Sequence, residues 1–174
     1  SQTDRLISFV DFPATALSLA GADVPEVLQG DPFLGKTIAS PRRYVYGARS
    51  RADDMFEVSR SVFDGRHLYV RHFLPHLPYM QPGRIFDDRK LAIRTLRKLH
   101  QVGKLSERAS AMWAAQKPVE ELYDLKTDPH ELANLSESAQ HREVKEKLAM
   151  ELRRWMVAHR DSGLLPEAEY QIRA

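Results

Sequence analysis

The sequence predicts an α+β fold, in which a four-stranded antiparallel sheet carries a C-terminal helix packed on one face. First, residues 57–63 and 66–73 are strand-like and flank Asp64-Gly65, a strong hairpin turn pair. Second, apolar side chains near the C-terminus recur at the spacing of one helical stripe. Third, the expected order is helix, strands, helices, strand and helix, which favours helices gathered on one face of an antiparallel sheet.

The first forty residues are expected to form a helix followed by a loop. Asp11 is placed as the N-cap, with Pro13 in the first turn, where its missing N–H costs no hydrogen bond. Gly21 is the expected left-handed residue at the helix end. Residues 22–43 contain three prolines and two glycines, so we expect turns there and no regular element.

Four segments are predicted as strands. They are residues 44–48, 57–63, 66–73 and 121–125. In the second, Val58, Arg60 and Val62 alternate with polar side chains on the other face, and in the fourth Leu122 shares a face with Asp124. This alternation indicates an antiparallel meander with one packed face.

Three further helices are predicted after an irregular connection at residues 74–86. The first opens at Asp87 and Asp88, and Ser106 caps a second, short helix that includes Met112 and Trp113. The third runs from about residue 138 to about residue 160, with Ser138 as N-cap and Gly163 as a stop signal. Its apolar stripe consists of Val144, Leu148, Leu152, Trp155 and Met156.

Composition restricts the classes of function. The 174 residues are 43% hydrophobic and 29% charged, as in ordinary soluble domains, and the net charge of +2 does not favour nucleic acid or an anionic membrane as a partner. No apolar run approaches the roughly 20 residues of a membrane span. Residues 1–12 lack the basic and apolar regions of a signal peptide.

Metal and nucleophile chemistry have little support in the residues themselves. The chain has no cysteine, which excludes disulfides, thiolate nucleophiles and Cys-ligated zinc but does not indicate a compartment. His67, His72 and His76 lie close in sequence, without an HExxH pattern or a carboxylate at ligand spacing. We expect partly exposed histidines at strand ends and no metal site. A GxSxG pattern is also missing.

Residues 30–37 formally match the phosphate-binding string G-x-x-x-x-G-K-T. A functional loop of this kind follows a buried strand and opens a helix, whose backbone N–H groups hold the phosphates. Here residues 22–29 are not strand-like, and Ser40-Pro41 follows too soon for a sustained helix. We therefore expect no nucleotide site.

Residues 49–60 concentrate charge between two predicted strands. Guanidinium groups in this stretch suit sulfate, phosphate or carboxylate, and the neighbouring acids could orient them or accept sugar hydroxyls. The alternative is a solvated loop with weak ion pairs, which composition alone favours. The basic residues of the helix after Asp87 are likewise interpreted as a polar helix face. The residues alone indicate a soluble α+β domain without a complete catalytic set.

Residues 121–135, ELYDLKTDPHELANL, closely resemble the C-terminal signature of type I sulfatases. Three more stretches resemble the same family in the same order: SFVDFPATALSLAGADVP, VYGARSRADD with RSVFDGRHLYVRHF, and GKLSERASAMWAAQKPVEELYDL. The resemblance covers most of residues 7–156. In the signature, the acids are expected to form the turn, and Leu132 and Leu135 to pack the chain under the sheet.

The resemblance implies a division of the chain and a missing half. Residues 1–40 would be a helix and loop remnant of the large sulfatase domain, which is similar to alkaline phosphatase, and residues 41–174 the C-terminal subdomain. The family uses calcium and a formylglycine made within C/S-x-P-S/A-x-R, which this chain lacks. We therefore expect calcium and formylglycine in a full-length parent, and no catalytic residue, metal site or activity in this chain alone.

The resemblance also implies partners and a site. The partners would be the missing large catalytic domain and, in the parent, a sulfated carbohydrate or aryl sulfate, with the parent in the periplasm or outside the cell. A homo-oligomer is expected through the apolar helix that carries Leu17 and Leu19. Two alternatives stay open: a stand-alone interaction module, and a phosphoesterase or phosphonate hydrolase of the same superfamily. The expected substrate-binding residues are Arg49, Arg51, Asp53, Asp54, His72 and His76.

Overall fold

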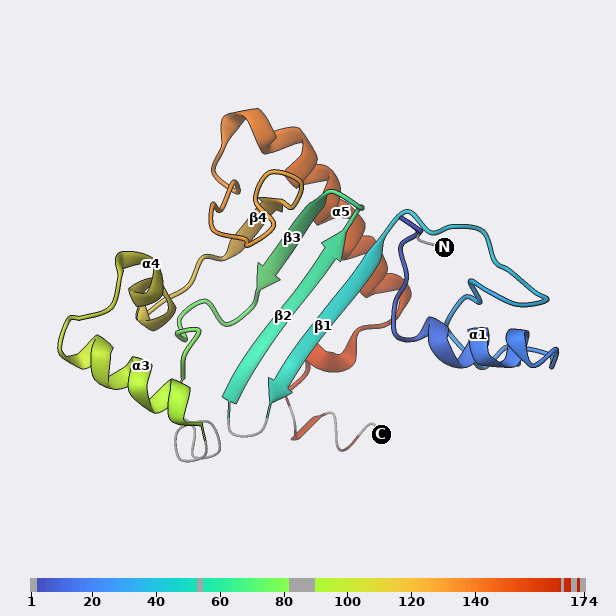
Figure 1. The fold of residues 1–174 in the computed structure, drawn as a ribbon, viewed down its shortest axis with the longest axis horizontal. Coiled ribbons are helices and arrows are strands. Elements are labelled where there is room, and N and C mark those ends of the chain that lie inside the picture. Colours follow the sequence, from blue (N-terminus) through green and yellow to red (C-terminus); the bar gives the residue numbers. More distant parts are fainter. Residues whose placement is uncertain (1–2, 53–54, 82–89, 167, 170–171, 173–174) are drawn as a thin grey trace.

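The computed structural model describes residues 3–52, 55–81, 90–166, 168–169 and 172, and it has the predicted α+β architecture (Figure 1). Four strands form one sheet in the order β1-β2-β3-β4, and every neighbouring pair is antiparallel. The strands are β1 (Val45–Ala52), β2 (Met55–Phe63), β3 (His67–His72) and β4 (Glu120–Asp124). The longer helices are α1 (Asp11–Leu19), α3 (Leu91–Gln101) and α5 (Arg142–Ala158). Short helical turns are α4 (Glu107–Ser110), η1 (Ala111–Trp113), η2 (Ala139–His141) and η3 (Ser162–Leu164).

The hairpin between β2 and β3 forms at the predicted turn. Gly65 adopts a left-handed backbone with φ of 98°, which a glycine tolerates without strain. The Asp64 carboxylate accepts the backbone N–H groups of Arg66 and His67 at 2.9 and 2.7 Å, and so closes the turn. This local bonding fixes the register in which Val62 faces Tyr69.

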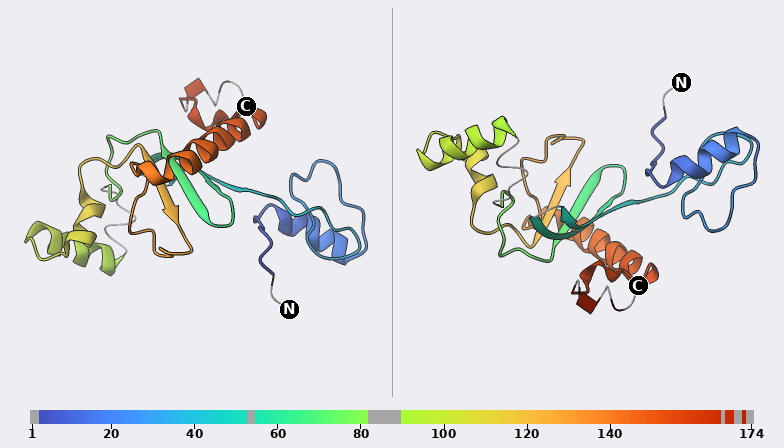
Figure 2. Two further views of the ribbon diagram at one scale, coloured as in Figure 1. Left: turned by 90° about the horizontal axis from the view of Figure 1, so that it is seen from above. Right: turned by 90° about the horizontal axis from the view of Figure 1, so that it is seen from below.

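Helix α5 covers one face of the sheet, and the hydrophobic core lies between them (Figure 2). Val62, Tyr69 and Leu122 lie in one row across three strands, and Leu148 and Leu152 of α5 pack on that row. The predicted stripe on the last helix and the shared face of Leu122 and Asp124 are therefore confirmed. The helix starts later than predicted, at Arg142, and ends at Ala158, five residues before Gly163. Ser138 bonds the ring of His141 in η2 and does not cap α5.

Helix α1 buries polar side chains and exposes apolar ones, whereas α5 buries the apolar side chains Leu148 and Leu152. Its buried side chains are Asp11, Ala14, Thr15 and Ser18, while Phe9, Phe12 and Leu19 are exposed. The buried polar groups hold the following loop: Thr15 accepts the N–H of Phe33, and Ser18 bonds Thr37. Asp11 is the first helical residue and not the N-cap as predicted, because its carboxylate accepts the N–H groups of Ser8 and Asp31 and the guanidinium of Arg42.

The segment after β4 folds back on the sheet as predicted. Asp128 accepts the N–H groups of Leu132 and Ala133, so this acid does form the turn. Asn134 then lies beside β4, accepting the N–H of Leu122 and donating to the carbonyl of Glu120. Leu135 packs against the core, but Leu132 is exposed, and the prediction for Leu132 was therefore wrong.

Helices α3 and α4 form in the region where the sequence predicts two helices. Ser106 accepts the N–H of Ala109 and caps α4 as predicted. Asp87 and Asp88 lie outside the described residues, and α3 begins at Leu91. Figure 1 shows α3 and α4 beside each other at one end of the sheet and α1 at the other. Within the described ranges, none of the helices is both long and apolar enough to cross a bilayer.

Candidate functional site

The structure separates the two predicted arginines of β1. Arg49 pairs with Ser59, on the face opposite α5, whereas Arg51 pairs with Phe56. The β-bulge between them turns Ser50 and Arg51 toward the α5 side, where Ser50 bonds Arg60 and Arg51 lies over the Phe56 ring. The charged residues of this region are therefore mostly strand residues on two faces, and not one binding loop as predicted.

The other predicted site residues have different surroundings. His72 ends β3 and is buried, with 7% of its surface exposed, whereas His76 is exposed in the following loop. Asp53 and Asp54 lie outside the described residues. Ser59 is the cross-strand partner of both Arg49 and His72, so these two side chains occupy one row on the face opposite α5. The structure thus places Arg49 and His72 on one face of the sheet, where Arg49 is exposed and His72 is buried.

A buried polar group surrounds His72. This His72 cluster, as we call it, consists of Glu57, His72, Tyr79, Lys117 and Glu121. The ring Nδ1 lies 3.6 Å from Glu57 Oε1, and Nε2 lies 3.4 Å from Glu121 Oε2. Lys117, whose side chain is fully buried, pairs with Glu57, and the Tyr79 hydroxyl donates to Glu121. Five polar side chains from β2, β3, β4 and two connecting segments therefore meet in one place.

The cluster leaves several buried polar atoms without a partner. It combines two carboxyl groups, one amino group and one imidazole. Neither ring nitrogen of His72 has a hydrogen-bond partner, and neither has Glu57 Oε1, although all three atoms are buried. Such unsatisfied groups are costly to bury, at about 1–3 kcal/mol each. The cluster therefore stabilises the sheet less than a fully hydrogen-bonded polar group would.

The surroundings fix the protonation of two cluster members. Burial raises the pKa of Tyr79, and its hydrogen bond to Glu121 raises it further, so the hydroxyl stays a donor. Burial also raises the pKa of Glu121, but the adjacent His72 and the Tyr79 hydroxyl outweigh it and hold this pKa below its usual value. Glu121 is thus a carboxylate at neutral pH.

The His72 cluster opens onto a surface pocket of about 790 Å³ between β4 and α4. Tyr79 and Glu121 belong to both the cluster and the pocket wall. Carboxylates and tyrosine hydroxyls can bond sugar hydroxyls, and a guanidinium can bond an anionic group. Residues that could make such contacts here are Tyr79, Arg108, Glu121, Tyr123 and Glu131.

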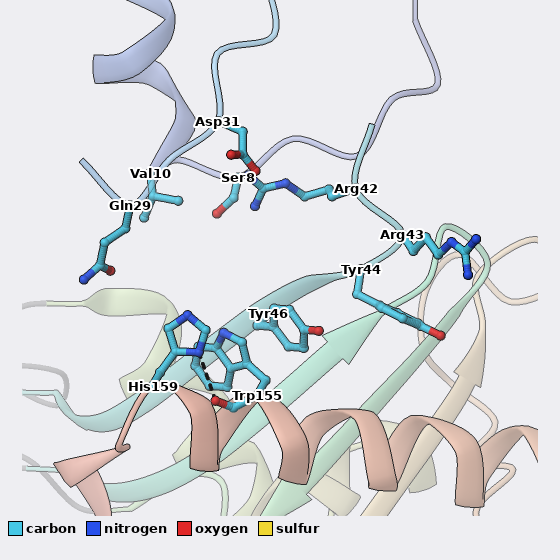
Figure 3. Close-up of a pocket in the computed structure, with 10 residues that line it drawn as sticks. All are labelled: Ser8, Val10, Gln29, Asp31, Arg42, Arg43, Tyr44, Tyr46, Trp155 and His159. Atoms are coloured by element: carbon cyan, nitrogen blue, oxygen red, sulfur yellow. Dashed lines mark hydrogen bonds and ion pairs between the residues drawn. The ribbon is translucent and has the colours of Figure 1, made fainter. Parts of the chain in front are cut away.

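A second pocket, of about 380 Å³, lies between the N-terminal segment and α5 (Figure 3). Its floor carries Tyr46 and Trp155, whose ring centres stack 4.9 Å apart. The ring of His159, the residue that follows α5, lies 5.2 Å from that of Trp155. Because these rings pack on one another, less of each aromatic face is open to a ligand. Arg42 is paired with Asp31 and Asp11. This pocket is therefore a weaker candidate than the one beside His72.

The phosphate-loop string has a structural role. A Cβ on Gly30 would overlap the carbonyl of Val10, and Gly35 needs φ of 102° and lies against Ser18. The N–H groups of Lys36 and Thr37, which would have to face a phosphate, bond to Ser18. No helix follows the string in the described chain, and the expectation of no nucleotide site is supported by this geometry.

Metal ligation has no support in the described residues. Among residues 3–52, 55–81, 90–166, 168–169 and 172, no group of three His, Cys, Asp or Glu side chains is placed to hold an ion. The ring of His67 lies within ion-pair distance of the Asp64 carboxylate, and the ring of His72 lies within ion-pair distance of two glutamates. The part of the chain that the structure describes therefore offers no set of calcium ligands.

Sequence reasoning missed most of the His72 cluster. Glu57 lies 60 residues before Lys117 in the sequence. Glu121 follows Lys117 closely, so only Glu57 is distant from the other two. The one available signal was the alternation in β2 and β4, which places Glu57 and Glu121 on the face opposite Val62 and Leu122. Burial of that second face could not be read from the alternation.

Comparison with known proteins shows similarity to sulfatases. No family model matches it. The chain is 38% identical over 165 residues to an ulvan-active sulfatase from Formosa agariphila, an alignment that covers 95% of this chain and 28% of that protein. A solved 2-O GAG sulfatase has the same fold with a TM-score of 0.61 at 18% identity, over 93% of this chain and 27% of the other.

A further solved structure, of a protein in complex with its substrate D-glucosamine-2-N,6-O-disulfate, has a TM-score of 0.54 at 18% identity over 90% of this chain and 25% of the other. The chain thus spans only about a quarter of the proteins it matches. The matched part is nearly the whole of this chain. The chain belongs to the sulfatases and is a sulfatase C-terminal domain.

Proposed function

We propose that this domain serves a sulfuric ester hydrolase that acts on a sulfated carbohydrate, and that it supports the catalytic domain and lines the substrate pocket without being active by itself. The 38% identity to an ulvan-active sulfatase across 95% of the chain is the observation that carries the proposal. The structural relative that binds a sulfated glucosamine supports the class of substrate. An aryl sulfate is the simpler substrate that the same chemistry would accept.

The exposed apolar face of helix α1 supports a proposed division of the chain. In this proposal residues 1–40 belong to the large catalytic domain, and residues 41–174 form the C-terminal subdomain. Helix α1 buries Asp11 and Ser18 against the following loop and exposes Phe12 and Leu19, and Phe9, just before the helix, is 88% exposed. An apolar face of this kind needs a cover. The rest of the sulfatase is the cover that we propose, although a second copy of the chain could also use Leu17 and Leu19.

Calcium and formylglycine would belong to the catalytic part of the enzyme. The chain has no cysteine, and its described residues do not form a set of metal ligands. When bound, these groups supply the nucleophile and the positive charge for attack on the sulfate ester. The role left to this domain is to orient the organic part of the substrate.

The face opposite α5 is the proposed contribution to the substrate pocket. Arg49 and His72 share this face, and the pocket beside Glu121 opens next to it. Arg49 would bind an anionic group, and Glu121 would accept a sugar hydroxyl. Arg51, on the other face, and exposed His76 are weaker members of the site, and Asp53 and Asp54 stay predictions.

Assays of the complete protein, including the sequence before Ser1, test this function. We expect sulfate release from a sulfated polysaccharide, and a lower rate when Arg49 is replaced by Ala. The control is Arg153→Ala, because Arg153 is exposed on α5, which packs on the other face of the sheet from Arg49. Phosphate release from a phosphate ester without sulfate release would replace the proposal with the phosphoesterase alternative. A complete protein without any C/S-x-P-S/A-x-R motif would favour the stand-alone module.

A further inference from the structure

The two edges of the sheet differ in how their backbone groups are bonded. Strands β1 and β4 are the edge strands, because the sheet has the order β1-β2-β3-β4 (Figure 1). At β4 the following segment covers the outer edge. Asn134 accepts the N–H of Leu122 and donates to the carbonyl of Glu120. Leu135 donates its N–H to the carbonyl of Leu122, so β4 offers no template for another strand.

The outer edge of β1 carries the backbone N–H and C=O groups of Tyr46 and Ala48. In an antiparallel sheet, successive residues of a strand bond alternately to the neighbours on its two sides. The N–H of Phe73 bonds the carbonyl of Val58, so the even-numbered residues of β2 bond β3 and the odd-numbered ones bond β1. Up to the bulge, odd-numbered residues of β2 face odd-numbered residues of β1. Tyr46 and Ala48 therefore direct their backbone groups away from β2, and no strand of the described chain lies beside them.

This edge lacks the features with which proteins usually prevent strand addition. Such features are charged side chains, Pro, a β-bulge or a covering segment. Residues 45–48, VYGA, contain no charged residue and no Pro, and the bulge of β1 comes only after Arg49. Ala48 is exposed. The edge of β1 is therefore open to a further strand.

The pocket of about 380 Å³ lies along this edge (Figure 3). Tyr46 belongs both to the edge of β1 and to the pocket, and Ser8 and Val10 line the pocket on the side of the N-terminal segment. In a strand added to β1, the residue opposite Tyr46 would have its side chain on the α5 side of the sheet. Trp155 and His159 line the pocket on that side. The pocket therefore suits an extended segment with an apolar side chain at that position.

We propose that the edge of β1 binds an extended strand from the catalytic part of the same sulfatase, which continues the sheet beyond β1. This inference rests on the proposed function, because it names the partner of the domain. The chain covers only 28% of the ulvan-active sulfatase that it matches, so most of such an enzyme lies outside it. Ser8 and Val10 belong to residues 1–40, which we assign to the catalytic domain, so the pocket lies where the two parts meet. A second copy of this chain would bring β2 and α5 with its own β1, and a cavity of about 380 Å³ has no room for them.

Hydrogen exchange at the backbone amides of Tyr46 and Ala48 tests the inference. Both amides should exchange more slowly in the complete protein than in the 174-residue chain, by on the order of a hundredfold. Ala48→Pro removes an outward N–H and keeps the bonds between β1 and β2, since that N–H is not part of their ladder. In the complete protein this variant should abolish the protection of the Tyr46 amide, whereas Ala48→Ser, which keeps the N–H, should retain it. The comparison of the two unmutated proteins does not depend on either variant.

Each outcome decides between distinct accounts. Equal exchange rates in the 174-residue chain and the complete protein would overturn the inference. Slow exchange in the chain alone that depends on its concentration would replace the catalytic part by a second copy as the occupant. Sulfate release by a complete protein in which both amides exchange quickly would leave the proposed function intact and reject this inference alone. Slow exchange in a complete protein that releases no sulfate would reject the proposed function and retain the added strand.

Discussion

Replacing Asp161 by Ala should destabilise the domain strongly, because it leaves the buried Arg60 without its anion. The Arg60 side chain is 1% exposed, and all five of its N–H groups donate hydrogen bonds. Two of them reach Asp161, from Nε at 2.6 Å and from Nη2 at 2.9 Å, and the others reach Ser50 and the carbonyls of Arg49 and Ser59. The pair therefore fastens the segment after α5 to β2.

The magnitude follows from burial. Removal of one partner of a buried ion pair costs about 3–5 kcal/mol, since the remaining charge is unpaired. Asp161 is 13% exposed, so water can partly replace its carboxylate, and we expect about 3 kcal/mol. For a chain of this size the midpoint of thermal unfolding should then fall by roughly 10 °C.

Urea unfolding followed by circular dichroism measures the loss. Arg60→Met removes the charge but keeps an apolar stem, so Arg60→Met/Asp161→Ala should lose less stability than the two single changes added together. A coupling of about 1.5 kcal/mol or more is expected. A loss below about 1 kcal/mol for Asp161→Ala, or strictly additive single changes, would refute the account of this pair.

Three further predictions concern the core, the turn after β4 and acid stability. Leu148→Ala in the fully buried core should cost about 2–5 kcal/mol, whereas Met150→Ala on the exposed side of α5 should change the free energy of unfolding by less than about 0.5 kcal/mol. Asn134→Ala leaves the N–H of Leu122 without its acceptor and should cost about 1–3 kcal/mol in urea unfolding, and a neutral result would contradict the role of this side chain. The hydrogen bond from Arg66 holds the pKa of Asp124 well below its usual range, so this carboxylate stabilises the fold above pH about 4, and its contribution is lost as pH falls further. Asp124→Asn should lower stability at pH 7 and flatten its fall in acid, and an unchanged acid profile would contradict this.

Local chemistry explains which parts of the fold could be predicted. The turn at Asp64-Gly65, the cap at Ser106 and the stripe with Leu148 and Leu152 each depend on residues that are close in sequence. The start of α5 was displaced because Ser138 bonds His141 instead of a helical N–H, which sequence alone does not reveal.

Long-range pairing decides where the predicted site residues lie. Arg49 and Arg51 were expected to act together, but a single bulge in β1 sends them to opposite faces. The His72 cluster depends on Lys117 and Glu57, which are distant in sequence and meet only after the sheet has formed. Such encounters depend on strand register, and no local pattern encodes them.

Sulfate release by the purified 174-residue chain tests the central claim most directly. With a sulfated polysaccharide and calcium present, the chain alone should release no sulfate above background, while the complete protein, with the sequence that precedes Ser1, should turn over the same substrate. Turnover by the isolated chain at the rate of an enzyme would contradict the assignment of the reactive groups to another domain.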